Sequence, residues 1–238
     1  MSWRRNTLLA AVAPEEWDEV ADRSGFEIIK AGECLQQSGE EIEQVYFPLS
    51  GVLTVGAETV EGEIVHVALL GKEGGLGVLE ACGSRQAHAQ GQVLVSGHVV
   101  RLPAETYRNL YAASANFRGA IHEYTETMLA EARLSIACNA LHSVEMRLAK
   151  TLLLLTDLTG TPVAPVTQEL LSQMLGVQRT TVSAVMSSLQ KRGLIERRRG
   201  AVNILDPQGV QSAACSCRAT LAFTAREIQT SPAQICGA

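Results

Sequence analysis

The chain has 238 residues, of which 46% are hydrophobic, and a formal net charge of −5 at pH 7. This length allows a well-buried core in one large or two modest domains, and the composition is that of a globular protein, which excludes disordered and fibrous classes. No apolar run approaches the roughly eighteen residues that a membrane span needs, so we expect no integral membrane protein.

The opening stretch, MSWRRNTLLAAVAPEE, has the outline of a secretory signal peptide. Its apolar core is too short, however, and Glu15 and Glu16 follow at once, so we interpret it as a surface helix. Cytoplasmic localisation is expected, because the cysteines form no disulfide framework in a chain of this length. They lie at positions 34, 82, 138, 215, 217 and 236.

Between Phe26 and about Leu102 the sequence consists of short Val-, Ile-, Leu- and aromatic-rich runs separated by glycines. Regularly spaced runs of strand length predict a sandwich, barrel or jelly roll. The runs are FEIIKAGECL, QVYFPLSGVLTVG, EIVHVALLG and QVLVSGHVVRLP.

A long helix is predicted from Asn116 to about Ser143, a stretch without proline. One face of this helix carries a row of mostly apolar side chains. This row either packs on the chain's own strand domain or pairs with its twin in a dimer, and we favour the dimer because a small domain cannot cover so long a helix. The expected interface residues are Phe117, Ile121, Tyr124, Met128 and Ser135, with His142 extending the row.

Two short helices follow, separated only by Gly176, Val177 and Gln178. Thr167 is a suitable N-cap for the first, and Gly176 is suited to end it. In the second, apolar residues recur at helical spacing from Val182 to Leu189. A three-residue connection forces the helices to cross steeply, which predicts a helix-turn-helix. LIERRRGAVNIL then predicts a hairpin wing around Arg199 and Gly200.

Residues 176–205 contain six of the chain's twenty basic residues and one acid, so this segment carries +5 and the remainder −10. A basic patch by itself is usually only a solvated face. Combined with the helix-turn-helix spacing and the wing, it instead predicts local binding of double-stranded DNA, with the second helix in the major groove. We assign base contacts to Gln178, Arg179, Thr180 and Ser183, and phosphate contacts to Thr167, Thr181, Lys191, Arg197, Arg198 and Arg199.

These motifs, together with LLAAVAPEEW, VYFPLSGVLTV, ACNALHSVEMRLAKTLL and QELLSQMLGVQRTTVSAVMSSLQKRGLI, resemble the Crp/Fnr family of bacterial transcription regulators over about residues 6–206. The resemblance implies an α+β fold with an N-terminal double-stranded β-helix (jelly roll), a long dimerisation helix and a C-terminal winged helix-turn-helix. We accordingly expect an effector domain at 1–115, a dimerisation helix at 116–145, a DNA-binding domain at 146–210 and a tail at 211–238.

The chain departs from this family pattern at the effector site. Members that bind cyclic nucleotides have a Gly-Glu whose carboxylate holds the ribose and an Arg-Ser or Arg-Thr pair that holds the phosphate, whereas this chain has Gly74-Gly75 and Arg85-Gln86. Gly75, Arg85 and Gln86 remain candidate effector-pocket residues, but cyclic AMP is not the expected effector. Arg85 is alternatively a surface residue of a loop.

Neither a metal nor another cofactor is predicted. The oxygen-sensing branch of the family needs closely spaced N-terminal cysteines, and this chain has only Cys34 before residue 82. Cys215, Cys217 and Cys236 could bind a metal or respond to oxidation, but we interpret them as ordinary thiols. In the recognition helix, Arg179 and Thr181 match the family while Thr180 replaces a Glu, which indicates a different operator.

The leading hypothesis is thus a homodimeric, non-enzymatic DNA-binding regulator. DNA and a second copy of the chain are its expected partners, with RNA polymerase and an unidentified small-molecule effector as further candidates and no membrane. One alternative is a jelly-roll metalloenzyme using His66, His88 and His98, although these histidines are isolated in sequence. The other is a ligand-binding or protein-interaction module of the same fold without specific DNA recognition.

Overall fold

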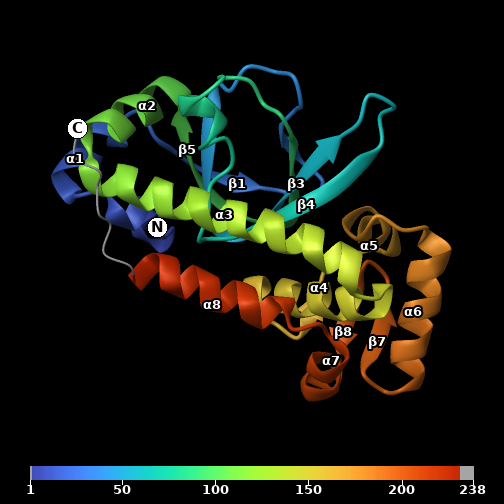
Figure 1. Ribbon diagram of the computed structural model, residues 1–238. Helices are drawn as coiled ribbons and strands as arrows, with labels where there is room; N and C mark the ends of the chain where they lie inside the picture. Colours follow the sequence, from blue (N-terminus) through green and yellow to red (C-terminus); the bar gives the residue numbers. More distant parts are fainter. Residues whose placement is uncertain (1, 231–238) are drawn as a thin grey trace.

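An antiparallel β-sheet forms the N-terminal domain of the computed structural model, which describes residues 2–230 (Figure 1). The sheet order is β1-β5-β3-β4, and the short β2 also pairs with β5. The long strands β3 and β5 pair along most of their lengths with several register shifts, which lets them bend around the core. The strands are β1 (Gly25–Ile29), β2 (Cys34–Gln36), β3 (Gln44–Glu58), β4 (Ile64–Leu70) and β5 (Gln90–Pro103). The predicted strand runs are confirmed.

The opening stretch is part of this domain's core, so its interpretation as a surface helix is wrong. It forms two short 3-10 turns, Trp3–Arg5 and Leu9–Ala11, before α1 (Pro14–Ala21). Leu8, Leu9 and Val12 are buried with the sheet residues. The buried Asn6 holds the segment in place, because its amide donates to the carbonyl oxygens of Pro48 and Gly74.

Two helices follow the sheet, α2 (Ala104–Ala113) and the long α3 (Ala115–Leu141). Ser114 ends the first and caps the second, where its hydroxyl accepts from the Phe117 amide at 3.2 Å. The α3 helix then extends beyond the sheet toward the C-terminal domain, as Figure 1 shows. Its bounds agree closely with the predicted long helix.

Part of the predicted dimer interface lies on the inner face of α3 and is covered by the chain's own effector domain. Phe117 and Ile121 are buried in the core of their own effector domain, and Tyr124 packs against the same core. A second copy therefore cannot reach Phe117 or Ile121, and the alternative that the row packs on its own strand domain holds for this half of the helix. Met128 and Ser135 are half-buried and stay predictions.

The C-terminal domain is a small helical core covered on one side by a three-stranded sheet. Its hairpin is the predicted wing, and α5 and α6 are the predicted helix-turn-helix, so the expected α+β fold class is confirmed. The elements are α4 (Val144–Thr159), β6 (Val163–Ala164), α5 (Gln168–Leu175), α6 (Arg179–Lys191), β7 (Ile195–Arg198) and β8 (Ala201–Ile204).

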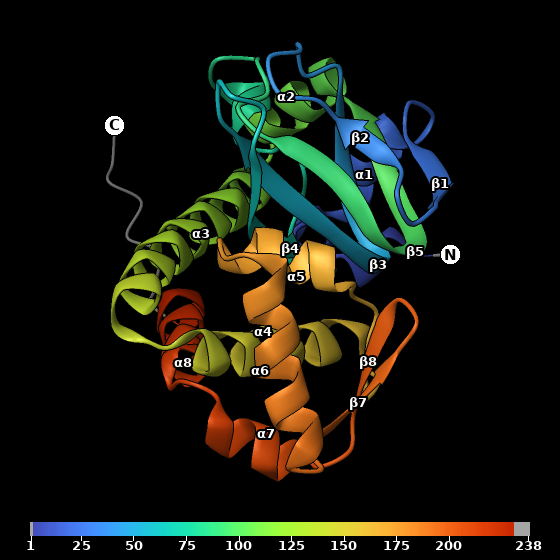
Figure 2. The ribbon, with the colours of Figure 1, turned by 90° about the vertical axis from the view of Figure 1, so that its right-hand side faces the viewer.

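The segment after residue 206, of which the sequence predicted only a tail from 211, continues as α7 (Pro207–Ala213) and α8 (Cys217–Thr230). Figures 1 and 2 show α8 turned back beside α3. Buried cysteines contribute to this contact, Cys138 from α3 with Cys215 and Cys217 from the tail. Cys236 lies outside the described residues. None of the described helices combines the length and apolar character that crossing a bilayer requires.

Two glycines allow β3 and β5 to approach closely, and they generate a stability prediction. A β-carbon on Gly97 would overlap the backbone carbonyl of Ser50, and the facing Gly51 has φ of +83°. Gly97→Ala should lower the free energy of unfolding by about 1–3 kcal/mol, because backbone atoms must shift. Denaturant unfolding at fixed protein concentration measures this.

The matched control is Gly119→Ala in α3, where a β-carbon meets nothing within 4 Å. This variant should be up to about 1 kcal/mol more stable, because alanine is the better helix former. Equal stability changes in the two variants would contradict the close approach of the strands.

Candidate DNA-binding surface

The turn between α5 and α6 has the local geometry that its residues favour. Thr167 caps α5 by accepting from the Leu170 amide at 3.1 Å, and Gly176 ends the helix with φ of +60°. The small Ser172 is buried at the crossing, where its hydroxyl donates to the Glu169 carbonyl oxygen at 2.6 Å. These features set the bounds of α5, so that α6 starts at the surface after a three-residue connection.

Helix α6 separates apolar from polar residues by face. Val182, Met186 and Leu189 are buried against α4 and α5. On the other face Gln178, Arg179, Thr180 and Ala184 are exposed, while Thr181 and Ser183 are half-buried. Figure 2 shows α6 along the outside of the C-terminal domain, so its polar face is open to a partner.

The wing presents the arginines of the β7–β8 turn. Arg198 pairs with Ala201 across the hairpin, leaving Arg199 and Gly200 as a two-residue turn in which Gly200 has φ of +73°. Arg197 donates to the Ser187 hydroxyl at 3.1 Å, which connects the wing to α6. Arg198 forms an ion pair with Glu196 at 2.8 Å, and hydrogen bonds from Arg198 and from Asn203 lower the pKa of the Glu196 carboxyl.

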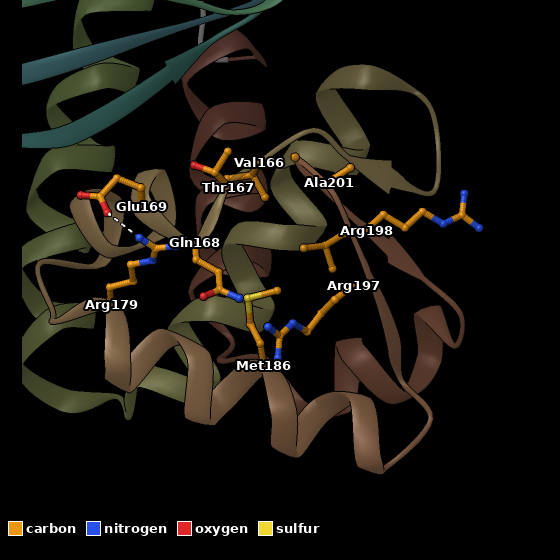
Figure 3. Close-up of a pocket in the computed structure, with 11 residues that line it drawn as sticks. Val166, Thr167, Gln168, Glu169, Arg179, Met186, Arg197, Arg198 and Ala201 are labelled. Atoms are coloured by element: carbon orange, nitrogen blue, oxygen red, sulfur yellow. Dashed lines mark ion pairs between the residues drawn. The ribbon is translucent and has the colours of Figure 1, made fainter.

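A concavity of about 390 Å³ lies between the first turns of the helix-turn-helix and the wing (Figure 3). Of the predicted contact residues, Thr167, Arg179, Arg197 and Arg198 line it. Arg179 reaches Glu169 at 3.9 Å, with both side chains more than half exposed, and such an ion pair is weak. Arg179 and Arg197 have guanidinium groups on this side, whereas the Arg198 side chain points away from them and pairs with Glu196. These two guanidinium groups against the Glu169 carboxylate make this wall a suitable surface for a polyanion.

The other predicted contact residues lie outside the concavity, and they are Gln178, Thr180, Thr181, Ser183, Lys191 and Arg199. Lys191 is at the far end of α6, about 18 Å from Arg179 at the rise of an α-helix. The neighbouring Arg192 forms an ion pair with Glu145 of α4 at 2.6 Å. A phosphate would have to compete with that carboxylate for Arg192.

None of the candidate effector-pocket residues lines the concavity described in their domain. Gly75 is buried, and a β-carbon there would lie 2.6 Å from Val78, so position 75 has no room for a carboxylate side chain. Arg85 and Gln86 are exposed, and Arg85 has φ of +64°. The effector-domain concavity of about 450 Å³ is lined by residues between Leu35 and Tyr46 instead.

The sequence did not reveal that the effector domain contacts the helix-turn-helix directly. Strand β4 lies against α5, and Leu69 from β4 packs on the C-terminal core. His66 on the same strand is buried, which lowers its pKa, while a hydrogen bond with Gln173 of α5 opposes this shift. The effector domain and the first helix of the DNA-binding unit are therefore in direct contact.

The three histidines of the metalloenzyme alternative have separate surroundings. Nδ1 of His66 lies 3.0 Å from the Thr54 hydroxyl, and Nδ1 of His98 lies 3.3 Å from the Ser50 hydroxyl. Nε2 of His88 lies 2.8 Å from the Ser84 hydroxyl. Within residues 2–230, one cluster of side chains could hold a metal, and it consists of Cys138, His142, Cys215 and Cys217. It contains none of these three histidines.

Comparison with known proteins matches both halves of the chain. Residues 26–114 match the cyclic nucleotide-binding domain, and residues 146–213 match the Crp-like helix-turn-helix domain. The combination defines a two-domain transcription regulator. The chain belongs to the Crp/Fnr family of transcription regulators. No curated protein sequence matches it.

Solved structures share the fold at low sequence identity. A Eubacterium rectale protein assigned to the Crp/Fnr regulators is 20% identical, with a TM-score of 0.72 over 88% of this chain and 98% of its own. A CRP-family regulator from Thermus thermophilus is 18% identical, with a TM-score of 0.69 over 79% and 96%. The c-di-GMP responsive regulator CLP of Xanthomonas campestris is 16% identical, with a TM-score of 0.68 over 81% and 99%.

Proposed function

We propose that this regulator binds a pseudo-palindromic DNA operator as a homodimer and reads its sequence through the first turn of α6. The observation that carries this proposal is the exposed polar start of α6 beside a concavity lined by three arginines. In a helix-turn-helix these N-terminal residues face base edges, and a basic wing supplies contacts to the phosphate backbone.

The residues divide by the chemistry of their contacts. Arg179 is the base reader, because its guanidinium can donate two parallel hydrogen bonds to O6 and N7 of guanine. Gln178, Thr180 and Ser183 supplement this readout. Phosphates are bound by Thr167, Thr181, Lys191, Arg197, Arg198 and Arg199, which set the register of the protein on DNA and carry no sequence information.

Replacing Arg179 and Arg198 separately should separate these two roles. Arg179→Ala should lower discrimination at one base pair by about 1–3 kcal/mol, whereas Arg198→Ala should weaken all sequences alike and reduce the salt slope by about one. Affinities for the operator selected from random DNA, and for single-base variants of it, measured over a range of salt concentrations, test both.

Arg23→Ala is the control for loss of a positive charge, because Arg23 is exposed in the effector domain. It should leave affinity and salt slope unchanged. Arg179→Ala should barely change the free energy of unfolding, because the ion pair that it removes is weak and exposed. If Arg179→Ala weakened specific and random DNA equally, base readout by Arg179 would be refuted.

The outward face of α3 supports dimerisation through two exposed apolar residues that the sequence prediction did not include. Leu129 and Ile136 are seven residues apart and exposed to 49% and 72%, and the small Ala132 between them is also exposed. A seven-residue spacing brings apolar side chains back to one side of a helix, as a two-helix seam requires. Two-fold pairing along this seam would place two α6 helices for half-sites about one DNA turn apart.

Ile136→Asp should therefore convert the dimer to monomer, because a seam cannot bury an unpaired carboxylate without a large cost. Sedimentation velocity measures the change, and operator affinity should fall with it. Val60→Asp is the control, since Val60 is fully exposed on the β3–β4 loop. If Ile136→Asp were still a dimer at the protein concentration at which the wild type is a dimer, the interface would lie elsewhere.

We further propose that cyclic AMP is not the effector. The lack of space at Gly75 excludes a ribose-binding carboxylate at that position, and Arg85 lies on an exposed loop. Calorimetric titration of the protein with cyclic AMP should show no saturable heat. Saturable binding with one site per chain would contradict this part of the proposal.

A further inference from the structure

Four potential metal ligands meet where α3 ends and α8 begins. Cys138 and His142 come from the last turn of α3, and Cys215 and Cys217 from the start of the tail. Their ligand atoms all lie within 4.8 Å of one another. The three cysteines are buried and His142 is half-buried, so the cluster belongs to the interior between two helices and not to the surface.

The separations resemble the edges of a tetrahedral zinc site. The sulfurs of Cys138 and Cys215 are 3.6 Å apart, and the Cys217 sulfur lies 3.5 Å from Nδ1 of His142. With Zn–S bonds of about 2.3 Å and Zn–N bonds of about 2.0–2.1 Å, tetrahedral ligands lie about 3.5–3.8 Å apart. The longest separation in the cluster needs a shift of about 1 Å to reach this geometry.

Three buried thiolates need a bound cation to offset their negative charge. A metal must displace the thiol protons as it binds, because the thiolate is the ligand. Nζ of Lys150 lies 3.6 Å from the Cys138 sulfur. Zinc with three thiolates and a neutral imidazole carries a net charge of −1, which the Lys150 ammonium offsets.

The backbone holds the ligands in place from both sides. The His142 amide donates to the Cys138 carbonyl oxygen at 3.1 Å, which keeps these two residues on one turn. The Cys215 amide lies 3.4 Å from the Met146 carbonyl oxygen, and the Thr220 amide donates to the carbonyl oxygen of Ser216, so that α8 begins at the ligand Cys217. Cys138 and Cys217 lie in helices, while His142 directly follows α3 and Cys215 lies in the short link between α7 and α8.

We propose that Cys138, His142, Cys215 and Cys217 form a Cys₃His site for a zinc ion. Thiolate and imidazole are the ligands that structural zinc sites use, and four protein ligands leave no open position for catalysis. The ion would fasten α8 to α3 one residue before Ser143, which caps α4 and begins the DNA-binding domain. This site is independent of the proposed DNA contacts.

The test is metal binding by the reduced full-length chain. Protein purified with a phosphine reductant should contain about one zinc per chain by elemental mass spectrometry. After chelation, titration with Co²⁺ alone should give the visible bands of tetrahedral thiolate coordination, and added Zn²⁺ should abolish them. Chelation should also lower the melting temperature, because a metal bound only by the folded state stabilises it.

Cys217→Ser should lower the Co²⁺ affinity by more than about 100-fold. Removing a residue that only hydrogen-bonds to a metal ligand already costs about 10–100-fold in metal affinity, and removing the ligand itself should cost more. Cys34→Ser and Cys82→Ser remove exposed thiols and should retain the site. Cys236→Ser should also retain it. If Cys217→Ser fails to fold, the wild-type Co²⁺ spectrum and the three controls still decide.

Four results would overturn the proposal. The first is a reduced wild-type protein that contains no zinc and gives no tetrahedral Co²⁺ spectrum. The second is an unchanged Co²⁺ spectrum in Cys217→Ser, and the third is loss of that spectrum in Cys236→Ser. The last is a Cys138–Cys215 disulfide that forms in place of metal uptake. The last requires the two sulfurs to close from 3.6 Å to about 2.05 Å.

Discussion

The other parts of the structure depend on the packing of α3 against the β-domain. Tyr124 lies over Gly74, where a β-carbon would lie 2.6 Å from its hydroxyl oxygen. Phe117 and Ile121 complete the contact inside the core. This close approach leaves little space for a side chain at position 74. The same contact therefore brings α3 against the loop that contains Gly74 and Gly75.

The helix connects three regions that are distant in sequence. Its first half is buried against the sheet, its middle exposes Leu129 and Ile136, and its last turn meets α8 through Cys138. The DNA-binding unit is also held by β4, whose Leu69 packs on the C-terminal core. The β-domain is thus joined to the DNA-binding unit in two ways, by the chain connection at Ser143 and by the β4–α5 contact.

Much of the fold could be predicted because its elements have local causes. Gly176 and the short connection to α6 require a turn, Thr167 starts α5, and the spacing from Val182 to Leu189 gives α6 one apolar face. The prediction was wrong at the opening stretch, where Leu8 and Val12 enter the core of a sheet formed by later residues. It was also wrong for Phe117 and Ile121, because helical periodicity identifies an apolar face but not the surface that covers it.

The sequence by itself determined the long helix α3, the helix-turn-helix, the strands, the wing and the basic character of the DNA-binding segment, since each depends on residues a few positions apart. Only the tertiary structure decided which side of α3 is left open to a second copy, that Gly75 has no space for a side chain, and that the cysteines form a cluster. Cys138 and Cys215 are 77 positions apart, and no local pattern specifies a contact over that distance. Their meeting depends on the chain turning back so that α8 lies beside α3, which is a property of the assembled core.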